Sequence, residues 1–253
     1  MRNILDMTDK VVLITGGSRG LGRAMAQGFA EHGAHVAIVS RKLGACESAA
    51  REIESLGRRA FPYACHVGHW DELDAMVDAV YEHFVKVDVL INNAGMSPLY
   101  PSLTEVTEEL FDKVIGVNFK GPFRLSAIVG PRMVADGGGS IINISSTASV
   151  QPRAGVAPYA GAKAALNAIT KSFADEYGPT VRVNCIMAGP FLTDVSKAWA
   201  PSQAFKERAA RDIAMHRAGK PEEIVGAALY LASDAASFTT GAVFPVEGGQ
   251  LSG

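Results

Sequence analysis

The sequence predicts an α/β protein in which a doubly wound parallel sheet of about seven strands carries helices on both faces. Short apolar runs alternate with longer segments of helical periodicity from one end of the chain to the other. The runs are rich in β-branched residues and lack strict polar alternation, which is typical of strands buried on both faces. Only short glycine and proline clusters separate the elements, so residues 1–253 are expected to form a single domain.

The expected strands are spaced so that a helix fits between neighbours. Leu73, Met76 and Val80, for example, repeat at the spacing of one helix face. Thr107 is an expected helix N-cap, because the acidic residues that follow it meet the positive end of the helix. The expected strands lie at residues 11–14, 36–39, 61–65, 87–91, 141–144, 181–186 and 243–246, the third being the weakest.

Composition and charge exclude several classes of function. The 253 residues are 48% hydrophobic and 20% charged, which is ample apolar material for a core. The net charge of −2 and the scattered basic residues predict binding neither to nucleic acid nor to a membrane surface. No segment approaches the ~20 apolar residues of a membrane-spanning helix, and the first ten residues lack the apolar stretch of a signal peptide.

Cysteine usage indicates a reducing compartment. Cys46, Cys65 and Cys185 lie far apart and show no paired spacing, which argues against a disulfide framework or a zinc site. We therefore expect a cytoplasmic protein without a bound metal.

A glycine-rich turn follows the first expected strand directly. Residues 15–22 read Thr-Gly-Gly-Ser-Arg-Gly-Leu-Gly and lead into a helical pattern. Glycines at such a turn permit close backbone approach, so that a pyrophosphate can sit on the helix N-terminus. A turn without a ligand is the alternative, but its place at the first strand-to-helix connection favours a dinucleotide.

The Gly-x-x-x-Gly-x-Gly spacing of this turn resembles that of the short-chain dehydrogenase/reductase family. Residues 92–95 read Asn-Asn-Ala-Gly, Tyr159 and Lys163 form a Tyr-x-x-x-Lys pair, and Ser146 stands thirteen residues before Tyr159. Asn118 matches a further family motif, and the resemblance extends over essentially the whole chain. It is greatest to 3-oxoacyl-acyl-carrier-protein reductases and carbonyl reductases, and it implies a Rossmann fold that transfers hydride between a nicotinamide dinucleotide and a carbonyl or alcohol.

The resemblance implies that Asn118, Ser146, Tyr159 and Lys163 are the catalytic set. A carbonyl that gains a hydride at carbon needs a proton at oxygen. Tyr159 and Lys163 share one face of an expected helix, and we expect the ammonium to lower the Tyr159 pKa by roughly 1–3 units. Ser146, just past an expected strand, would donate to the substrate oxygen. Asn118, on the long helix expected after Thr107, resembles a residue that anchors a water in a proton relay to Lys163.

Each of these four residues also has a purely structural interpretation when taken alone. The tyrosine and lysine can be a packed residue and a solvated amine at helical spacing, the serine a turn former, and the asparagine a cap. It is their combination, in the family's order after a dinucleotide-type turn, that favours catalysis.

Charge at the end of the second expected strand indicates which cofactor binds. An NAD enzyme usually has an acidic residue there for the ribose 2′-hydroxyl. This chain has Ser40 and then Arg41, with Arg19 in the glycine turn. Two guanidiniums without a carboxylate can hold a 2′-phosphate, so NADP(H) is expected in preference to NAD(H). The alternative is two exposed arginines on a solvated edge.

The remaining cofactor contacts follow from the resemblance. His66 stands where the family usually has an aspartate that accepts a hydrogen bond from the adenine amino group, which leaves this contact open. Asn93 is expected near the adenosine ribose, or else it fixes a turn. The full expected cofactor set is Gly16, Ser18, Arg19, Gly20, Leu21, Gly22, Ser40, Arg41, His66, Val67, Asn93, Ala94, Gly95, Tyr159, Lys163, Gly189 and Thr193.

We therefore expect an NADP(H)-dependent reductase of a ketone or 3-oxoacyl substrate. An alcohol or sugar dehydrogenase working oxidatively is the alternative within enzymes, and a non-catalytic NADPH-binding regulator is the alternative of another class. Loops at residues 96–100, 147–158 and 190–205 are expected to form the substrate pocket, the last as a mobile lid or as a packed helix. The resemblance also implies a homotetramer, with helices around residues 107–135 and 159–177 at one interface.

Overall fold

The computed structural model describes residues 3–250, apart from the side chains of Val195 and Ala198, so both ends of the expected domain lie outside the described residues. Within this part, seven parallel strands form one sheet in the order β3-β2-β1-β4-β5-β6-β7. The strands are β1 (Val11–Thr15), β2 (His35–Ser40), β3 (Ala60–Ala64), β4 (Val89–Asn92), β5 (Gly139–Ser146), β6 (Val181–Ala188) and β7 (Val243–Val246).

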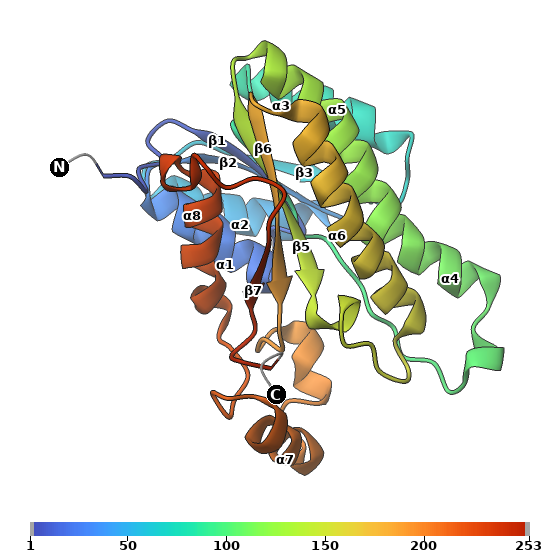
Figure 1. Cartoon of the computed structure of the whole chain (residues 1–253). Helices are drawn as coiled ribbons and strands as arrows, with labels where there is room; N and C mark the ends of the chain where they lie inside the picture. Colours follow the sequence, from blue (N-terminus) through green and yellow to red (C-terminus); the bar gives the residue numbers. More distant parts are fainter. Residues whose placement is uncertain (1–2, 251–253) are drawn as a thin grey trace.

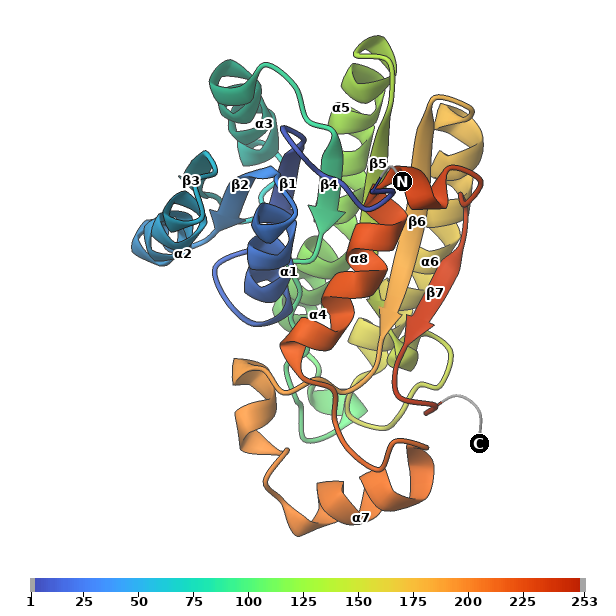
Figure 2. The same ribbon diagram turned by 90° about the vertical axis from the view of Figure 1, so that its left-hand side faces the viewer.

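Helices cover both faces of this sheet, which confirms the predicted fold class (Figure 1). Figure 2 looks onto the face covered by α1, α2 and α8, while α3, α5 and α6 lie behind the sheet. The helices are α1 (Gly20–Glu31), α2 (Leu43–Ser55), α3 (Glu72–Phe84), α4 (Glu108–Ile115), α5 (Gly121–Ala135), α6 (Ala157–Tyr177), α7 (Gln203–Asp212) and α8 (Val225–Ala232). No helix of residues 3–250 is long and apolar enough to cross a membrane.

Two buried clusters on opposite faces of the sheet explain why the strands are continuously apolar. Successive side chains of a strand point to opposite faces. In β1, Val12 and Ile14 pack in the cluster under α1, α2 and α8, whereas Leu13 packs in the cluster under α3, α5 and α6. All three are fully buried. Polar side chains can therefore be placed cheaply only where the strands end.

The order of the strands sets the position of a ligand crevice. The chain runs outward from β1 to β3 and then returns to β4 on the other side of β1. The connections on the two sides of this switch point diverge and leave a crevice at the carboxyl ends of β1 and β4. The turn from β1 into α1 lies at this edge, and α7 lies beyond it (Figures 1 and 2).

The helix expected after Thr107 differs from the prediction. Thr107 is the N-cap, since its Oγ1 accepts a hydrogen bond from the Leu110 N–H at 3.1 Å. However, α4 ends at Ile115, and a π-helical turn, η2 (Gly116–Lys120), separates it from α5. Asn118 therefore lies in this wider turn and not in a continuous α-helix. Such turns often occur at functional sites.

The close approach of α1 to α8 depends on Gly28. A Cβ at Gly28 would clash with Val225 Cγ1. We expect Gly28→Ala to lower the free energy of unfolding by ~1–3 kcal/mol, because overpacking outweighs the helix propensity of alanine. Adding Val225→Ala removes the clash, so a double-mutant cycle in urea should show a favourable coupling of about 1 kcal/mol or more.

Gly226→Ala is the matched control for this cycle. Gly226 is exposed on α8, and no atom lies within 4 Å of a Cβ built there. This substitution should leave the protein equally stable or stabilise it by less than ~1 kcal/mol. Equal stability of Gly28→Ala and Gly226→Ala would contradict the packing account.

Candidate functional site

The turn between β1 and α1 has backbone that only glycine adopts easily. Gly16 and Gly20 have φ values of +67° and +55°, in the left-handed region. A Cβ at Gly22 would clash with the Gly16 carbonyl oxygen and approach Asn93 Nδ2 to 2.5 Å. Glycine at these positions thus permits the tight backbone of this turn.

The start of α1 leaves its backbone donors available. Arg19 occupies the N-cap position, and no side chain there accepts a hydrogen bond from the first turn. The first turn, which includes Leu21, carries no acidic residue that would occupy these donors. A helix N-terminus of this kind favours an anion. The tight glycine turn and the uncapped helix together fit the pyrophosphate of a dinucleotide.

Thr15 and Asn93 join the glycine turn to the end of β4. Thr15 Oγ1 accepts hydrogen bonds from the backbone N–H groups of Asn93 and Ala94, both at 3.1 Å. Asn93 Nδ2 donates to the carbonyl oxygens of Thr15 and Gly16, at 2.9 and 3.3 Å. Both amide hydrogens of Asn93 are therefore engaged in holding the turn. Thr15 was not among the predicted site residues, although a threonine directly before the first glycine was a visible signal.

The end of β2 is tied to the glycine turn by hydroxyl groups. Ser18 Oγ donates to Ser40 Oγ at 2.9 Å, and Ser40 Oγ lies 3.0 Å from Cys46 Sγ in α2. The guanidiniums of Arg19 and Arg41 form no hydrogen bond or ion pair within the described part of the chain. Two unpaired cations thus lie beside a turn that fits a phosphate chain.

His66 lies two residues beyond the end of β3. Its Nδ1 accepts a hydrogen bond from the Gly68 N–H at 3.2 Å, and its ring stacks on His69 with centroids 4.4 Å apart. Partial burial lowers the His66 pKa, and the charges of His69 and Arg41 lower it further. Since the usual value is already 6.5, the imidazole is neutral at pH 7.

Tyr159 and Ser146 share a hydrogen bond at the carboxyl end of β5. Ser146 is the last residue of β5. The sequence had predicted a position just past the end of this strand. Burial raises the Tyr159 pKa, and the bond with Ser146 opposes this rise. The expectation that Lys163 lowers the Tyr159 pKa is therefore wrong for the protein without cofactor. The Lys163 Nζ lies 5.8 Å from the centre of the Tyr159 ring and bonds elsewhere.

Lys163 is 3% exposed, and its Nζ donates a hydrogen bond to the Ile144 carbonyl oxygen at 2.8 Å. Burial lowers the Lys163 pKa to about 8, and the nearby Cys185 opposes this shift. The bond to Ile144 holds α6 against β5, so that Tyr159, one turn earlier in α6, reaches Ser146. Lys163 is thus positioned by backbone and not by a carboxylate.

Asn118 is fully buried and holds the loop that follows β4. Its Nδ2 donates to the carbonyl oxygens of Met96 and Val114, at 2.8 and 2.9 Å, and its Oδ1 accepts from the Met96 N–H at 3.2 Å. A Cβ at Gly95 would lie 3.1 Å from Asn118 Oδ1 and 3.7 Å from Lys163 Nζ. The structure therefore brings Asn118, Gly95 and Lys163 together, with both side-chain donors of Asn118 already used.

The segment after β6 closes one side of the site. Thr193 lies near enough to Gly20 that a Cβ there would contact it at 3.4 Å, and Gly189 is packed against the Glu247 backbone. Phe205 is buried in α7 and packs with Trp199. For this part of the chain, the contact favours the predicted packed helix over the predicted mobile lid.

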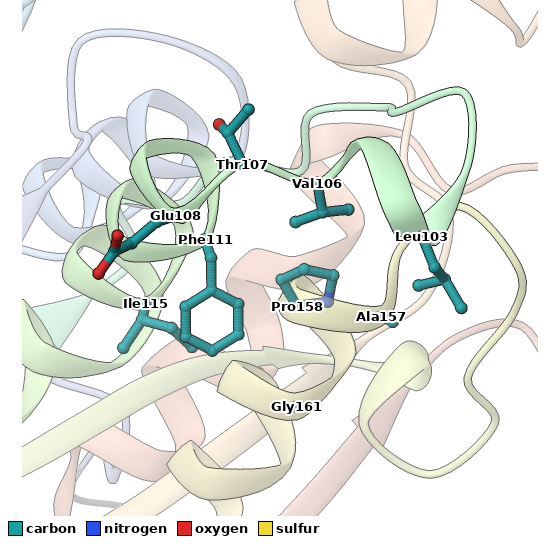
Figure 3. Close-up of a pocket in the computed structure, with 9 residues that line it drawn as sticks. All are labelled: Leu103, Val106, Thr107, Glu108, Phe111, Ile115, Ala157, Pro158 and Gly161. Carbon is teal, nitrogen blue, oxygen red and sulfur yellow. The ribbon is translucent and has the colours of Figure 1, made fainter.

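A separate apolar hollow of about 550 Å³ lies between α4 and the start of α6 (Figure 3). Phe111 and Pro158 line it, together with Leu103 and Val106. None of the predicted catalytic residues lines this hollow, so it is not the candidate active site. Among residues 3–250, no group of three or more histidine, cysteine or acidic side chains is placed to hold a metal.

Comparison with known proteins decides the family. The family model described as enoyl-(acyl carrier protein) reductase matches residues 16–250. Dehydrogenase/reductase SDR family member 4 from Bos taurus is 38% identical over 252 residues, which cover 99% of this chain and 90% of that protein. The chain belongs to the short-chain dehydrogenase/reductase family. It is an oxidoreductase that acts on CH–OH or C=O groups with NAD(P).

Two further relatives of this short-chain dehydrogenase/reductase illustrate the range. A 3-oxoacyl-acyl-carrier-protein reductase from Thermotoga maritima is 36% identical over 241 residues, 95% of this chain and 97% of that protein. The crystal structure of L-sorbose reductase from Gluconobacter frateurii, complexed with NADPH and L-sorbose, superposes with a TM-score of 0.93 at 32% identity. The superposed region covers 99% of this chain and 100% of the L-sorbose reductase chain. The family resemblance predicted from the sequence is confirmed.

The buried Lys163 makes stability depend on pH in a defined direction. Burial lowers its pKa from 10.5 to about 8, so between these values the folded protein binds fewer protons than the unfolded chain. The contribution of this group to the free energy of unfolding therefore rises with pH. Relative to wild type, Lys163→Met should become less stable from pH 7 to pH 10 by about 2–3 kcal/mol.

Urea unfolding at the two pH values measures this difference. Lys171→Met, which removes an exposed amine from the same helix, is the matched control. If the free energies of unfolding of both variants change with pH in the same way as that of wild type, burial does not lower the Lys163 pKa as described.

Proposed function

We propose that this chain is an NADP(H)-dependent reductase of a ketone or 3-oxoacyl substrate. The observation that carries the cofactor preference is the end of β2, where Ser40 and Arg41 stand and no carboxylate does. Arg41 and Arg19, both unpaired among the described residues, would hold a 2′-phosphate by forked hydrogen bonds. The NADPH complex of the related L-sorbose reductase supports this choice.

The residues around the crevice fit the whole dinucleotide. The glycine turn and the start of α1 would bind the pyrophosphate, and Asn93 would lie near the adenosine ribose. Residues 94–95 and 189–193 would border the nicotinamide half. Lys163 would bind the nicotinamide ribose hydroxyls. When bound, the nicotinamide group supplies or accepts the hydride. The protein's own task is to orient the substrate oxygen and to manage its proton.

Tyr159 is proposed as the proton donor to the substrate oxygen. Its raised pKa keeps the phenol protonated at neutral pH, which is the form that reduction requires at the start. The Ser146 hydroxyl, bonded to Tyr159, would turn to donate to the same oxygen and stabilise its developing charge. Lys163 holds α6 against β5 through its bond to the Ile144 carbonyl oxygen and so keeps Tyr159 in place. Asn118 holds the Gly95–Met96 loop in place.

Oxidation of a sugar or secondary alcohol is the second candidate. Related solved structures include a gluconate 5-dehydrogenase from Burkholderia cenocepacia in complex with NADP and tartrate. The protonated Tyr159 and the Arg41 position favour reduction. A non-catalytic NADPH-binding role is disfavoured because Asn118, Ser146, Tyr159 and Lys163 are all present and brought together.

We further propose a single cytoplasmic domain over residues 1–253 that assembles as a homotetramer. The apolar hollow beside α4 and α6 supports an interface on this side, since Leu103 and Phe111 are 70% and 46% exposed there (Figure 3). A small-molecule carbonyl or alcohol is the proposed substrate, with no role in binding nucleic acid or membranes.

Tyr159→Phe tests the proton donor. The substitution keeps the ring but removes the hydroxyl, so we expect kcat for carbonyl reduction to fall by ~10²-fold or more. The Kd for NADPH, measured by fluorescence titration, should stay within about twofold. Tyr177→Phe on the same helix is the matched control and should retain activity. Turnover retained by Tyr159→Phe would remove Tyr159 from this role.

Arg41→Ala tests the 2′-phosphate site. Losing one forked charge contact should raise the Kd for NADPH at least ~tenfold and leave that for NADH within about twofold. Arg51→Ala removes an exposed cation from α2 and serves as the control. Equal losses of NADPH and NADH affinity in Arg41→Ala would contradict the assignment.

A further inference from the structure

Two consecutive residues beyond the end of β3, His66 and Val67, lie beside the proposed 2′-phosphate site. The Cys65 N–H donates to the Ser40 carbonyl oxygen at 2.9 Å, so His66 and Val67 follow directly from a residue anchored to the end of β2. The charge of Arg41 acts on the His66 ring. If the proposed function holds, the adenosine ribose lies at Ser40 and Arg41, and its base then lies next to His66 and Val67.

Hydrogen bonding fixes which ring nitrogen of His66 carries the proton. A backbone N–H can only donate, so the bond from Gly68 makes Nδ1 an acceptor without a hydrogen. The ring is neutral at pH 7, and its single hydrogen is therefore on Nε2. Within residues 3–250, Nε2 has no hydrogen-bond partner. His66 thus offers a ligand a donor and not an acceptor.

The neighbouring group is also a donor. The backbone N–H of Val67 has no hydrogen-bond partner in the described part of the chain, whereas its side chain is buried. Arg41, His69 and Glu72 are the other charged or titratable groups around the ring, and Glu72 is occupied by His69 Nδ1 at 2.8 Å and by the His66 N–H at 3.4 Å. The His66 ring itself, which stands where an acceptor would select an amino group, therefore offers only a donor.

A purine base is read by the hydrogen-bonding pattern of its edge. Adenine presents an amino donor at position 6 and an acceptor at N1, whereas a 6-oxopurine such as hypoxanthine presents an acceptor and a donor. Against two adjacent donors, each base forms one good contact and one repulsive contact. An acceptor in place of His66 would instead favour adenine at both positions and oppose hypoxanthine at both.

We propose that this chain binds reduced nicotinamide hypoxanthine dinucleotide phosphate about as tightly as NADPH, because His66 presents a donor where an acceptor would select adenine. His66 is accordingly the residue that sets the base specificity of the cofactor site. The proposal rests on the NADP(H) function proposed above and concerns only the base end of the ligand.

Calorimetric titration of the cofactor-free protein tests this at pH 7.5 with the two dinucleotides. The readout is the ratio of the Kd for the hypoxanthine form to the Kd for NADPH, expected below ~3 for wild type. His66→Asp and His66→Asn form a matched pair of equal size. The carboxylate only accepts, so its ratio should rise at least ~tenfold. The amide can accept from adenine and donate to hypoxanthine, so its ratio should lie between those of wild type and His66→Asp.

Both ligands carry the same phosphates, so the extra charge of His66→Asp cancels in the ratio. A wild-type ratio of ten or more, or equal ratios for the Asp and Asn variants, would overturn the proposal while NADPH binding still upholds the cofactor assignment. Binding of neither ligand by wild type would overturn the proposed function and this inference with it.

Discussion

Burial of the parallel sheet on both faces is the constraint on which the rest of the structure depends. Because α1, α2 and α8 cover one face and α3, α5 and α6 the other, the central strands β1, β4 and β5 have no solvated side. The polar side chains of the site lie where strands end. The last residues of β1, β2 and β5 are Thr15, Ser40 and Ser146. The parallel arrangement of the strands brings these ends to one edge of the sheet.

The same burial sets the chemistry of the catalytic pair in opposite directions. It raises the pKa of the Tyr159 phenol and lowers that of the Lys163 amine, so both groups are biased toward their neutral forms before a cofactor binds. The phenol thus carries the proton that reduction requires. An amine with a pKa of about 8 changes charge readily when ligand charges arrive nearby.

Much of the fold and the catalytic set could be predicted because apolar runs, glycine spacing and ordered motifs are written in the sequence itself. What could not be predicted depends on three-dimensional contacts. The π-helical turn at Asn118 interrupts a segment whose pattern predicted one long helix. The rise in the Tyr159 pKa depends on burial of the phenol. The engagement of the Asn93 amide by Thr15 and Gly16, and the donor on His66, likewise follow from local hydrogen bonds.

The central claim, that this site reduces carbonyls with NADPH, is tested most directly by the loss of NADPH absorbance with purified protein over a panel of carbonyls. The panel comprises 3-oxoacyl thioesters, cyclic and steroid ketones, quinones and ketoses, with NADH in parallel. We expect turnover on one class of carbonyl, faster with NADPH than with NADH. Demonstrable NADPH binding with no turnover on any carbonyl, or turnover with NADH alone, would contradict it.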